Sequence, residues 1–171
     1  MEIYLLRHAI AMERSEHHGP DEDRPLTAEG RRKLKRVAQA MRGMRLSFDA
    51  VYSSPLTRAL QTAEMVVEVL PLKERLQVSA LLKPATAAEK QMAWLRSLRP
   101  QPERVLLVGH EPNFSQLTSL LLTGHERMAI EFKKAGLCKV TAERVTAGSA
   151  VLHWLLAPKQ MARMLSSGAV K

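Results

Sequence analysis

Residues 3–11 read IYLLRHAIA, and this stretch decides what kind of fold the rest of the chain completes. Its first four residues, Ile3 to Leu6, are an unbroken apolar run, which is typical of a strand buried on both faces. The run stops at Arg7 and His8, two side chains that can carry positive charge. A buried strand with this ending indicates a sheet whose edge receives an anion.

The same arrangement recurs twice further along the chain. Residues 49–53 are followed by Ser54 and Pro55, and residues 105–108 are followed by Gly109 and His110. Ser54 and Pro55 predict the N-cap and first turn of a helix over LTRALQTAEMVVEVL, and Pro112 is placed to open another helix. Strands that alternate with helices predict a mostly parallel sheet covered on both faces.

The remaining elements complete this picture. Thr27 predicts the cap of a helix that ends near Gly43 and has Leu34, Val37 and Met41 on one face. We expect further helices over 86–98 and 158–165, a strand over 76–81, a hairpin of 137–143 with 150–156, and a loop over 12–24. The predicted fold class is a three-layer α/β/α sandwich with a mostly parallel central sheet, helices on both faces and an antiparallel hairpin near the C-terminus, built as a single domain over 1–171.

In open α/β sheets, ligands bind beyond the carboxyl ends of the strands. That rule brings Arg7, His8, Arg58 and His110 to one edge, with Arg58 in the first turn of its helix. Arginine binds phosphoryl oxygens in bidentate fashion, and histidine can act as a nucleophile or move protons. The set predicts a phosphate pocket, in which Ser54 is primarily a helix cap whose hydroxyl can touch phosphate. The sequence has no glycine-rich phosphate loop and no metal-ligand spacing.

Four motifs in order then resemble the histidine phosphatase superfamily. They are LRHA (6–9), DRPLT (23–27), SSPLTRALQTAE (53–64) and VGHEPN (108–113), and the resemblance covers nearly the whole chain. Within the superfamily the chain is most similar to the small SixA-type phosphohistidine phosphatases. Ala9 departs from the commonest Arg-His-Gly form of the first motif.

The resemblance implies roles for these residues. His8 would be the nucleophile, attacking phosphorus in line and forming a phosphohistidine intermediate. Arg7, Arg58 and His110 would hold the phosphoryl oxygens and neutralise charge in the transition state. Attack needs an unprotonated ring nitrogen, so we expect the other nitrogen of His8 to donate to a backbone carbonyl. The implied enzyme is a metal-independent phosphatase that uses no cofactor.

No carboxylic acid is well placed to protonate a leaving group. Where larger members of the superfamily carry an acid, this chain has Lys83 and Pro84, and Glu89 is expected in the following helix. Asp21, Glu22, Asp23 and Glu111 are other candidates without strong support. An alkoxide needs a proton donor on leaving, whereas an imidazole protonates near pH 6.5 by itself. The pocket therefore suits phosphohistidine better than ordinary phosphate esters.

Composition limits the partners. A net charge of +9 favours anionic partners, while 4% aromatic residues leave little for base stacking. Cys138 is the only cysteine, and no apolar stretch is long enough to span a bilayer. We expect a cytoplasmic monomer that binds a phosphohistidine-containing protein and phosphate ion, with no nucleic acid and no membrane as partners. His17 and His18 are expected to be solvated, His125 and His153 structural or exposed, and Trp94 and Trp154 in the core.

Three alternatives stay open. The nearest keeps the His8 chemistry and changes the substrate to a small phosphorylated metabolite, which the missing acid argues against. A non-catalytic phosphate-binding module would not need an attacking imidazole. A basic nucleic-acid binder predicts salt-dependent binding that survives the loss of His8.

Overall fold

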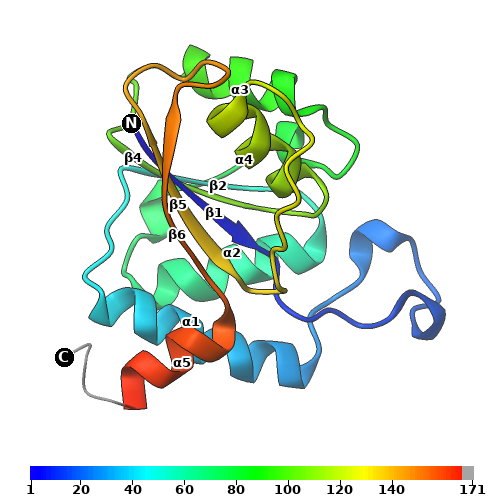
Figure 1. The fold of residues 1–171 in the computed structure, drawn as a ribbon. Coiled ribbons are helices and arrows are strands. Elements are labelled where there is room, and N and C mark those ends of the chain that lie inside the picture. The colour runs from blue at the N-terminus through cyan, green and yellow to red at the C-terminus, as the bar shows by residue number, and fades with distance from the viewer. Residues whose placement is uncertain (167–171) are drawn as a thin grey trace.

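The computed structural model describes residues 1–166 of the chain. Within these residues, six strands form one sheet in the order β3-β2-β4-β1-β5-β6 (Figure 1). The strands are β1 (Glu2–Arg7), β2 (Ala50–Ser53), β3 (Leu76–Val78), β4 (Arg104–Gly109), β5 (Leu137–Ala142) and β6 (Ala150–Leu156).

The sheet has the predicted mixture of strand directions. β1 pairs in parallel with β4, β4 with β2, and β2 with β3, whereas β5 is antiparallel to both β1 and β6. β5 and β6 form the expected hairpin. The prediction of a mostly parallel sheet with an antiparallel hairpin near the C-terminus is confirmed.

Helices cover both faces of the sheet, as Figure 1 shows. Tyr4 and Leu6 of β1 belong to one hydrophobic cluster, whereas Ile3 and Leu5 belong to a second. This division explains the unbroken apolar run at the start of the chain, because each strand must fill a core on either side. The first cluster is covered by α1 (Ala28–Gly43), α2 (Thr57–Val69) and α5 (Pro158–Ser166), and the second by α3 (Ala88–Ser97) and α4 (Asn113–Thr123).

Helix α1 begins and ends where the sequence predicts. The Thr27 hydroxyl oxygen accepts a hydrogen bond from the Gly30 main-chain N–H at 3.0 Å. This bond satisfies one of the N–H groups that the first turn leaves unpaired. The expected inner face of α1, including Leu34, Val37 and Met41, is fully buried.

Three local predictions are wrong. Helix α2 starts at Thr57 with Leu56 as its N-cap, so Ser54 and Pro55 lie before it. The third strand ends at Val78, and Ala80–Leu82 form a 3₁₀ turn instead of continuing it. Trp94 and Trp154 are half-buried at the margins of the core, where they pack edge-on against Tyr52 and Tyr4.

Residues 12–24 form the predicted loop at the end of the sheet. A bridge between Ala11 and Leu26 closes its base, and the loop contains two 3₁₀ turns, Arg14–Glu16 and Asp21–Asp23. Figure 1 shows the loop projecting past the end of β1. Among the helices of residues 1–166, none combines the length and apolar character that crossing a bilayer requires.

Candidate active site

Three strand ends bring the predicted site residues to one edge of the sheet. Arg7 at the end of β1 is in register with Gly109 at the end of β4, and Ser53 at the end of β2 is in register with Val108. Main-chain bonds continue this alignment, because His8 N–H donates to Gly109 O at 2.9 Å and Ser54 N–H donates to Val108 O at 2.9 Å. His8, Ser54 and His110 therefore follow three neighbouring strands, and Arg58 enters from the first turn of α2.

His8 is buried at the centre of this edge, and one of its ring nitrogens is held in a hydrogen bond. Its Nδ1 lies 2.8 Å from the main-chain oxygen of Ala9. A carbonyl oxygen only accepts hydrogen bonds, so Nδ1 carries the proton and Nε2 keeps its lone pair. Burial, and then the nearby His110, Arg58 and Arg7, lower the pKa of His8 from 6.5 to about 3, although the bond to Ala9 O acts in the opposite direction. His8 is thus neutral at pH 7 and has the ring form that a nucleophile needs.

His110 faces His8, with 5.1 Å between the ring centroids. Its Nε2 lies 2.8 Å from Ser54 Oγ, and the same oxygen accepts a hydrogen bond from Leu56 N–H at 3.3 Å. Ser54 is therefore not the cap of α2. When its hydroxyl donates to Nε2, the proton of the neutral His110 ring lies on Nδ1. Burial, and then the charge of Arg58, lowers the pKa of His110 to about 3.

Both arginines are held by main-chain carbonyls. Arg7 Nη1 donates to Phe132 O at 2.6 Å, and Arg58 Nη1 donates to Asp21 O at 2.8 Å. Arg58 Nη2 also lies 3.1 Å from Asp21 Oδ2. These contacts use Nη1 of Arg7 and both Nη atoms of Arg58, so the Nε–H of each guanidinium is left for another acceptor.

Residues at this edge of the sheet hold buried nitrogen atoms without partners. Among the described residues, Arg7 Nε, Arg58 Nε and His110 Nδ1 are buried and have no hydrogen-bond partner. An unpaired buried donor costs about 1–3 kcal/mol, so such groups are rarely left together without a purpose. A tetrahedral oxyanion offers acceptors to all three donors at once, and a neutral imidazole beside it can attack the central atom.

The candidate acids differ in their surroundings. Burial raises the pKa of Asp21, but the charges of Arg58 and Arg24 outweigh it and leave the pKa below its ordinary value. Glu22 is engaged by Lys83 at 3.1 Å. Burial raises the pKa of Glu111 above its ordinary value, although its bond from Ser115 N–H opposes this. Glu111 is therefore the carboxyl best suited to hold a proton at this end of the sheet.

The other histidines lie apart from the site. His17 Nε2 lies 3.1 Å from Pro20 O within the exposed loop. His153, on β6, has its Nε2 2.8 Å from Oγ1 of Thr141 on β5. His125 lies near Thr123 in the turn after α4. Over residues 1–166, no three His, Cys, Asp or Glu side chains are grouped to hold a metal ion.

Sequence reasoning missed the residues that support the site. Thr62 Oγ1 accepts a bond from Ala9 N–H at 3.1 Å and donates to Arg58 O at 2.7 Å, so it ties the segment after His8 to helix α2. Its spacing of four residues from Arg58 places both on one helix face, and that signal was available. Asp21 and Phe132 carried no such signal, because they contact the arginines from loops.

The chain is similar in sequence and in fold to proteins of one known superfamily. Residues 3–83 match the family model of the histidine phosphatase superfamily (branch 1). A protein of Picosynechococcus sp. described as uncharacterized is 36% identical over 138 residues, which are 80% of this chain and 82% of the relative. Phosphohistidine phosphatase SixA of Escherichia coli is 26% identical over 92% of this chain and 94% of its own. The solved structure of the protein histidine phosphatase SixA with tungstate superposes with a TM-score of 0.83 at 26% identity, over 93% of this chain and 98% of that one.

Proposed function

The chain belongs to the histidine phosphatase superfamily, and we propose that it is a phosphatase that hydrolyses phosphohistidine on a protein substrate through a phospho-His8 intermediate. The observation that carries the proposal is the neutral, tautomer-fixed His8 beside three unpaired buried nitrogens. Binding an anion alone would need those donors but would not need a ring with a free Nε2 lone pair.

The proposed reaction has two displacement steps. In the first, the Nε2 lone pair of His8 attacks phosphorus in line, and the bond from phosphorus to the substrate imidazole breaks. Arg7 and Arg58 bind phosphoryl oxygens through their Nε edges, and His110 binds through Nδ1, so the charge of the transition state meets donors that are already in position. In the second step, water attacks phospho-His8, releasing phosphate and the neutral ring.

The leaving group supports phosphohistidine as the substrate. An imidazole accepts a proton near pH 6.5, so it can depart without a strong acid in the protein. Asp21 is held as a carboxylate by Arg58 and Arg24, which makes it unsuitable as a donor. The similarity to SixA, which is a phosphohistidine phosphatase, points the same way.

A second candidate is a phosphatase of a small phosphorylated metabolite. Glu111 favours it, because a half-buried carboxyl with a raised pKa can protonate an alkoxide. In that case Glu111→Gln would slow ester hydrolysis by about 10²-fold or more and leave phosphohistidine hydrolysis nearly unchanged.

Phosphate release tests the proposal. The wild-type protein and its His8→Ala variant would be given a phosphohistidine protein and a panel of small phosphate esters, with a chelator present. We expect release from phosphohistidine, its loss in His8→Ala, and a phosphoryl group on His8 detected by mass spectrometry at neutral pH. His153→Ala, at an exposed histidine of β6, is the matched control and should stay active.

Two other results would change the assignment. Faster release from one ester would assign the protein to metabolite phosphatases and make Glu111 the first residue to test as the donor. Undiminished turnover by His8→Ala would overturn the phospho-His8 mechanism for either substrate.

A further inference from the structure

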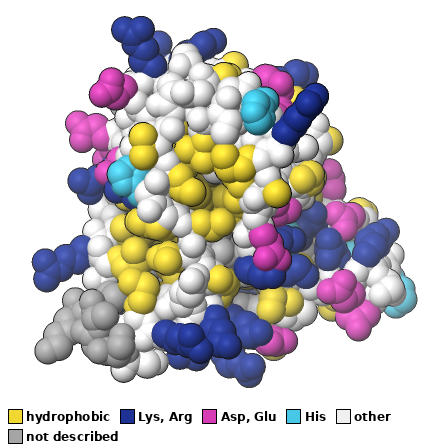
Figure 2. Space-filling model, viewed as in Figure 1, with side chains coloured by type: hydrophobic (Ala, Val, Ile, Leu, Met, Phe, Trp, Pro, Cys, Tyr) yellow, Lys and Arg dark blue, Asp and Glu magenta, His cyan; other side chains and the backbone are white. Residues whose placement is uncertain are grey.

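The positive charge of the chain is concentrated on two neighbouring helices. Helix α1 carries six Lys and Arg residues against one carboxylate, and α5 carries two against none. Together they hold a net charge of +7, out of +9 for the whole chain. The two helices pack against each other, and Figure 2 shows Lys and Arg side chains gathered along the lower margin, over α1 and α5.

These cations are exposed and mostly not neutralised nearby. Lys33 pairs with Glu29 at 2.6 Å within α1. For the others, no ion pair is formed within residues 1–166. We call them the basic face, and its members are Arg31, Arg32, Lys35, Arg36, Arg42, Lys159 and Arg163. A surface of this kind attracts an anionic partner over about a Debye length, 8 Å at physiological salt.

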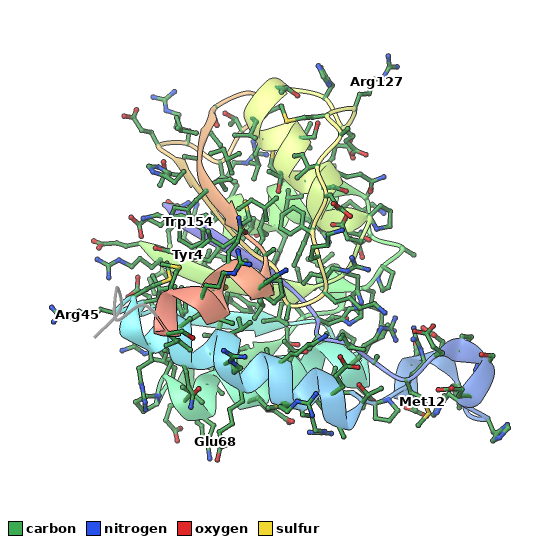
Figure 3. The ribbon with its side chains drawn as sticks, turned by 60° about the horizontal axis from the view of Figure 1, so that its bottom comes forward. Tyr4, Met12, Arg45, Glu68, Arg127 and Trp154 are labelled. Atoms are coloured by element: carbon green, nitrogen blue, oxygen red, sulfur yellow. The ribbon has the colours of Figure 1, made fainter. Side chains whose placement is uncertain are left out.

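The basic face begins beside the candidate active site. At the start of α1, Thr27 N–H donates at 3.0 Å to the main-chain oxygen of Ile10, and Ile10 lies two residues after His8 in the sequence. Figure 3, which turns this side forward, shows α1 running from the loop that carries Met12 to Arg45. Sixteen helical residues span about 24 Å, so the charge extends from the site along one side of the molecule.

The residues of α1 and α5 favour one kind of polyanion, an acidic protein, over nucleic acid and membrane. Neither α1 nor α5 contains an aromatic residue for base stacking. The large apolar side chains exposed within residues 1–166 are Val78, Met128, Val151 and Leu152, and none lies on these helices to enter a membrane. An acidic protein surface needs only complementary charge, and charge complementarity mainly raises the rate of encounter.

We propose that the basic face docks an acidic surface of the phosphohistidine-bearing substrate protein and aligns its phosphohistidine with His8. This inference rests on the proposed function. It adds that substrates are selected by charge well outside the pocket, and that the preference weakens as salt is added.

Two synthetic phosphohistidine peptides of equal length test this docking. One carries glutamates at every second position over ten residues beside the phosphohistidine, and the other carries glutamines there. Ten extended residues reach about 33 Å, enough to follow α1. We expect the wild-type protein to favour the acidic peptide about tenfold in kcat/KM at low salt, mainly through KM, and to lose the preference at high salt.

Charge-matched variants locate the effect. Arg32→Gln with Arg36→Gln should reduce the preference about three- to tenfold and leave turnover of the glutamine peptide unchanged. Lys90→Gln with Arg96→Gln removes the same charge from exposed positions of α3, on the other face of the sheet, and should keep the preference.

The outcomes separate this inference from the proposed function. If neither peptide is hydrolysed, the proposed function fails and the docking fails with it. If both are hydrolysed equally by the wild-type protein, or if the α3 variant loses the preference as much as the α1 variant, docking on the basic face is wrong and the function stands. Binding to anionic vesicles or duplex DNA that is lost in the α1 variant, while its peptide preference persists, would assign the face to that other polyanion.

Discussion

At the scale of single residues, Arg58 depends on Asp21 for its orientation. Asp21 supplies both its main-chain oxygen and a carboxylate oxygen to the Nη end of Arg58, and Arg24 Nε lies 3.0 Å from the other carboxylate oxygen. Asp21 therefore has two opposite effects on anion binding. It directs the Nε edge of Arg58 toward the site, and its negative charge repels a phosphoryl group.

The two effects predict opposite results when Asp21 is changed. If positioning dominates, Asp21→Ala lowers kcat/KM about 10- to 100-fold, because small misplacements of a binding group are costly, whereas Asp21→Asn, which keeps an acceptor oxygen, loses less. The measurement is kcat and KM with phosphohistidine, together with the inhibition constant of inorganic phosphate. Glu22→Ala, in the same 3₁₀ turn and paired with Lys83, is the control and should change little. Tighter phosphate binding by Asp21→Ala would mean that repulsion dominates.

At the scale of elements, helix α1 is fixed to the end of β1 by a contact that allows no side chain. A Cβ added at Gly30 would lie 2.1 Å from the main-chain oxygen of Ile10. Neither atom is at the end of a flexible side chain, so one of the two elements would have to move. Gly30 is thus needed for close approach, although glycine weakens a helix interior by about 1 kcal/mol.

Gly30→Ala should therefore destabilise the protein in spite of its better helix propensity. We expect a loss of about 1–3 kcal/mol in the free energy of unfolding, the usual cost of overpacking, measured by urea denaturation. Activity should fall as well, because Ile10 follows His8 closely. Glu29→Ala, at the neighbouring exposed position, should cost less than about 0.5 kcal/mol. Equal stability of Gly30→Ala and the wild-type protein would show that α1 can shift away from β1 at no cost.

At the scale of the whole molecule, folding buries two neutral histidines against two arginines. Burial is the largest cause that lowers the pKa of His8 and of His110 to about 3, from an ordinary value of 6.5. The unfolded chain therefore binds protons below pH 6.5 that the folded protein does not bind. Above pH 6.5 these two groups do not change the free energy of unfolding with pH. As the pH drops from 6.5 toward 3, they lower it progressively.

This linkage predicts the pH dependence of stability. Between pH 7 and pH 5, each buried histidine should remove about 2 kcal/mol from the free energy of unfolding. Replacing His8 with Asn should reduce the loss by about that amount, as measured by urea denaturation at the two pH values. His153→Asn, at an exposed histidine, should leave the loss unchanged. The same pH dependence in His8→Asn and the wild-type protein would contradict a neutral, buried His8.

The sequence by itself determined the order and type of the elements and the edge at which the site lies. Apolar runs and the Thr27 cap depend only on residues close together in the sequence, so they can be recognised without the structure. The strand ends at Arg7, Ser53 and Gly109 meet at one edge because parallel strands run in a common direction. The structure confirmed the backbone acceptor expected for His8 and identified it as the carbonyl of the next residue, Ala9.

Only the tertiary structure decided how the site is supported. The carbonyls of Phe132 and Asp21, the bond from Ser54 to His110 and the burial that keeps both histidines neutral join segments as much as 125 residues apart. Ser54 shows the limit most clearly: its local preference is to cap a helix, but folding places it 2.8 Å from His110 and the helix starts at Thr57. Contacts of this kind depend on where loops lie after the sheet has formed, and no periodicity or cap in the sequence encodes that position.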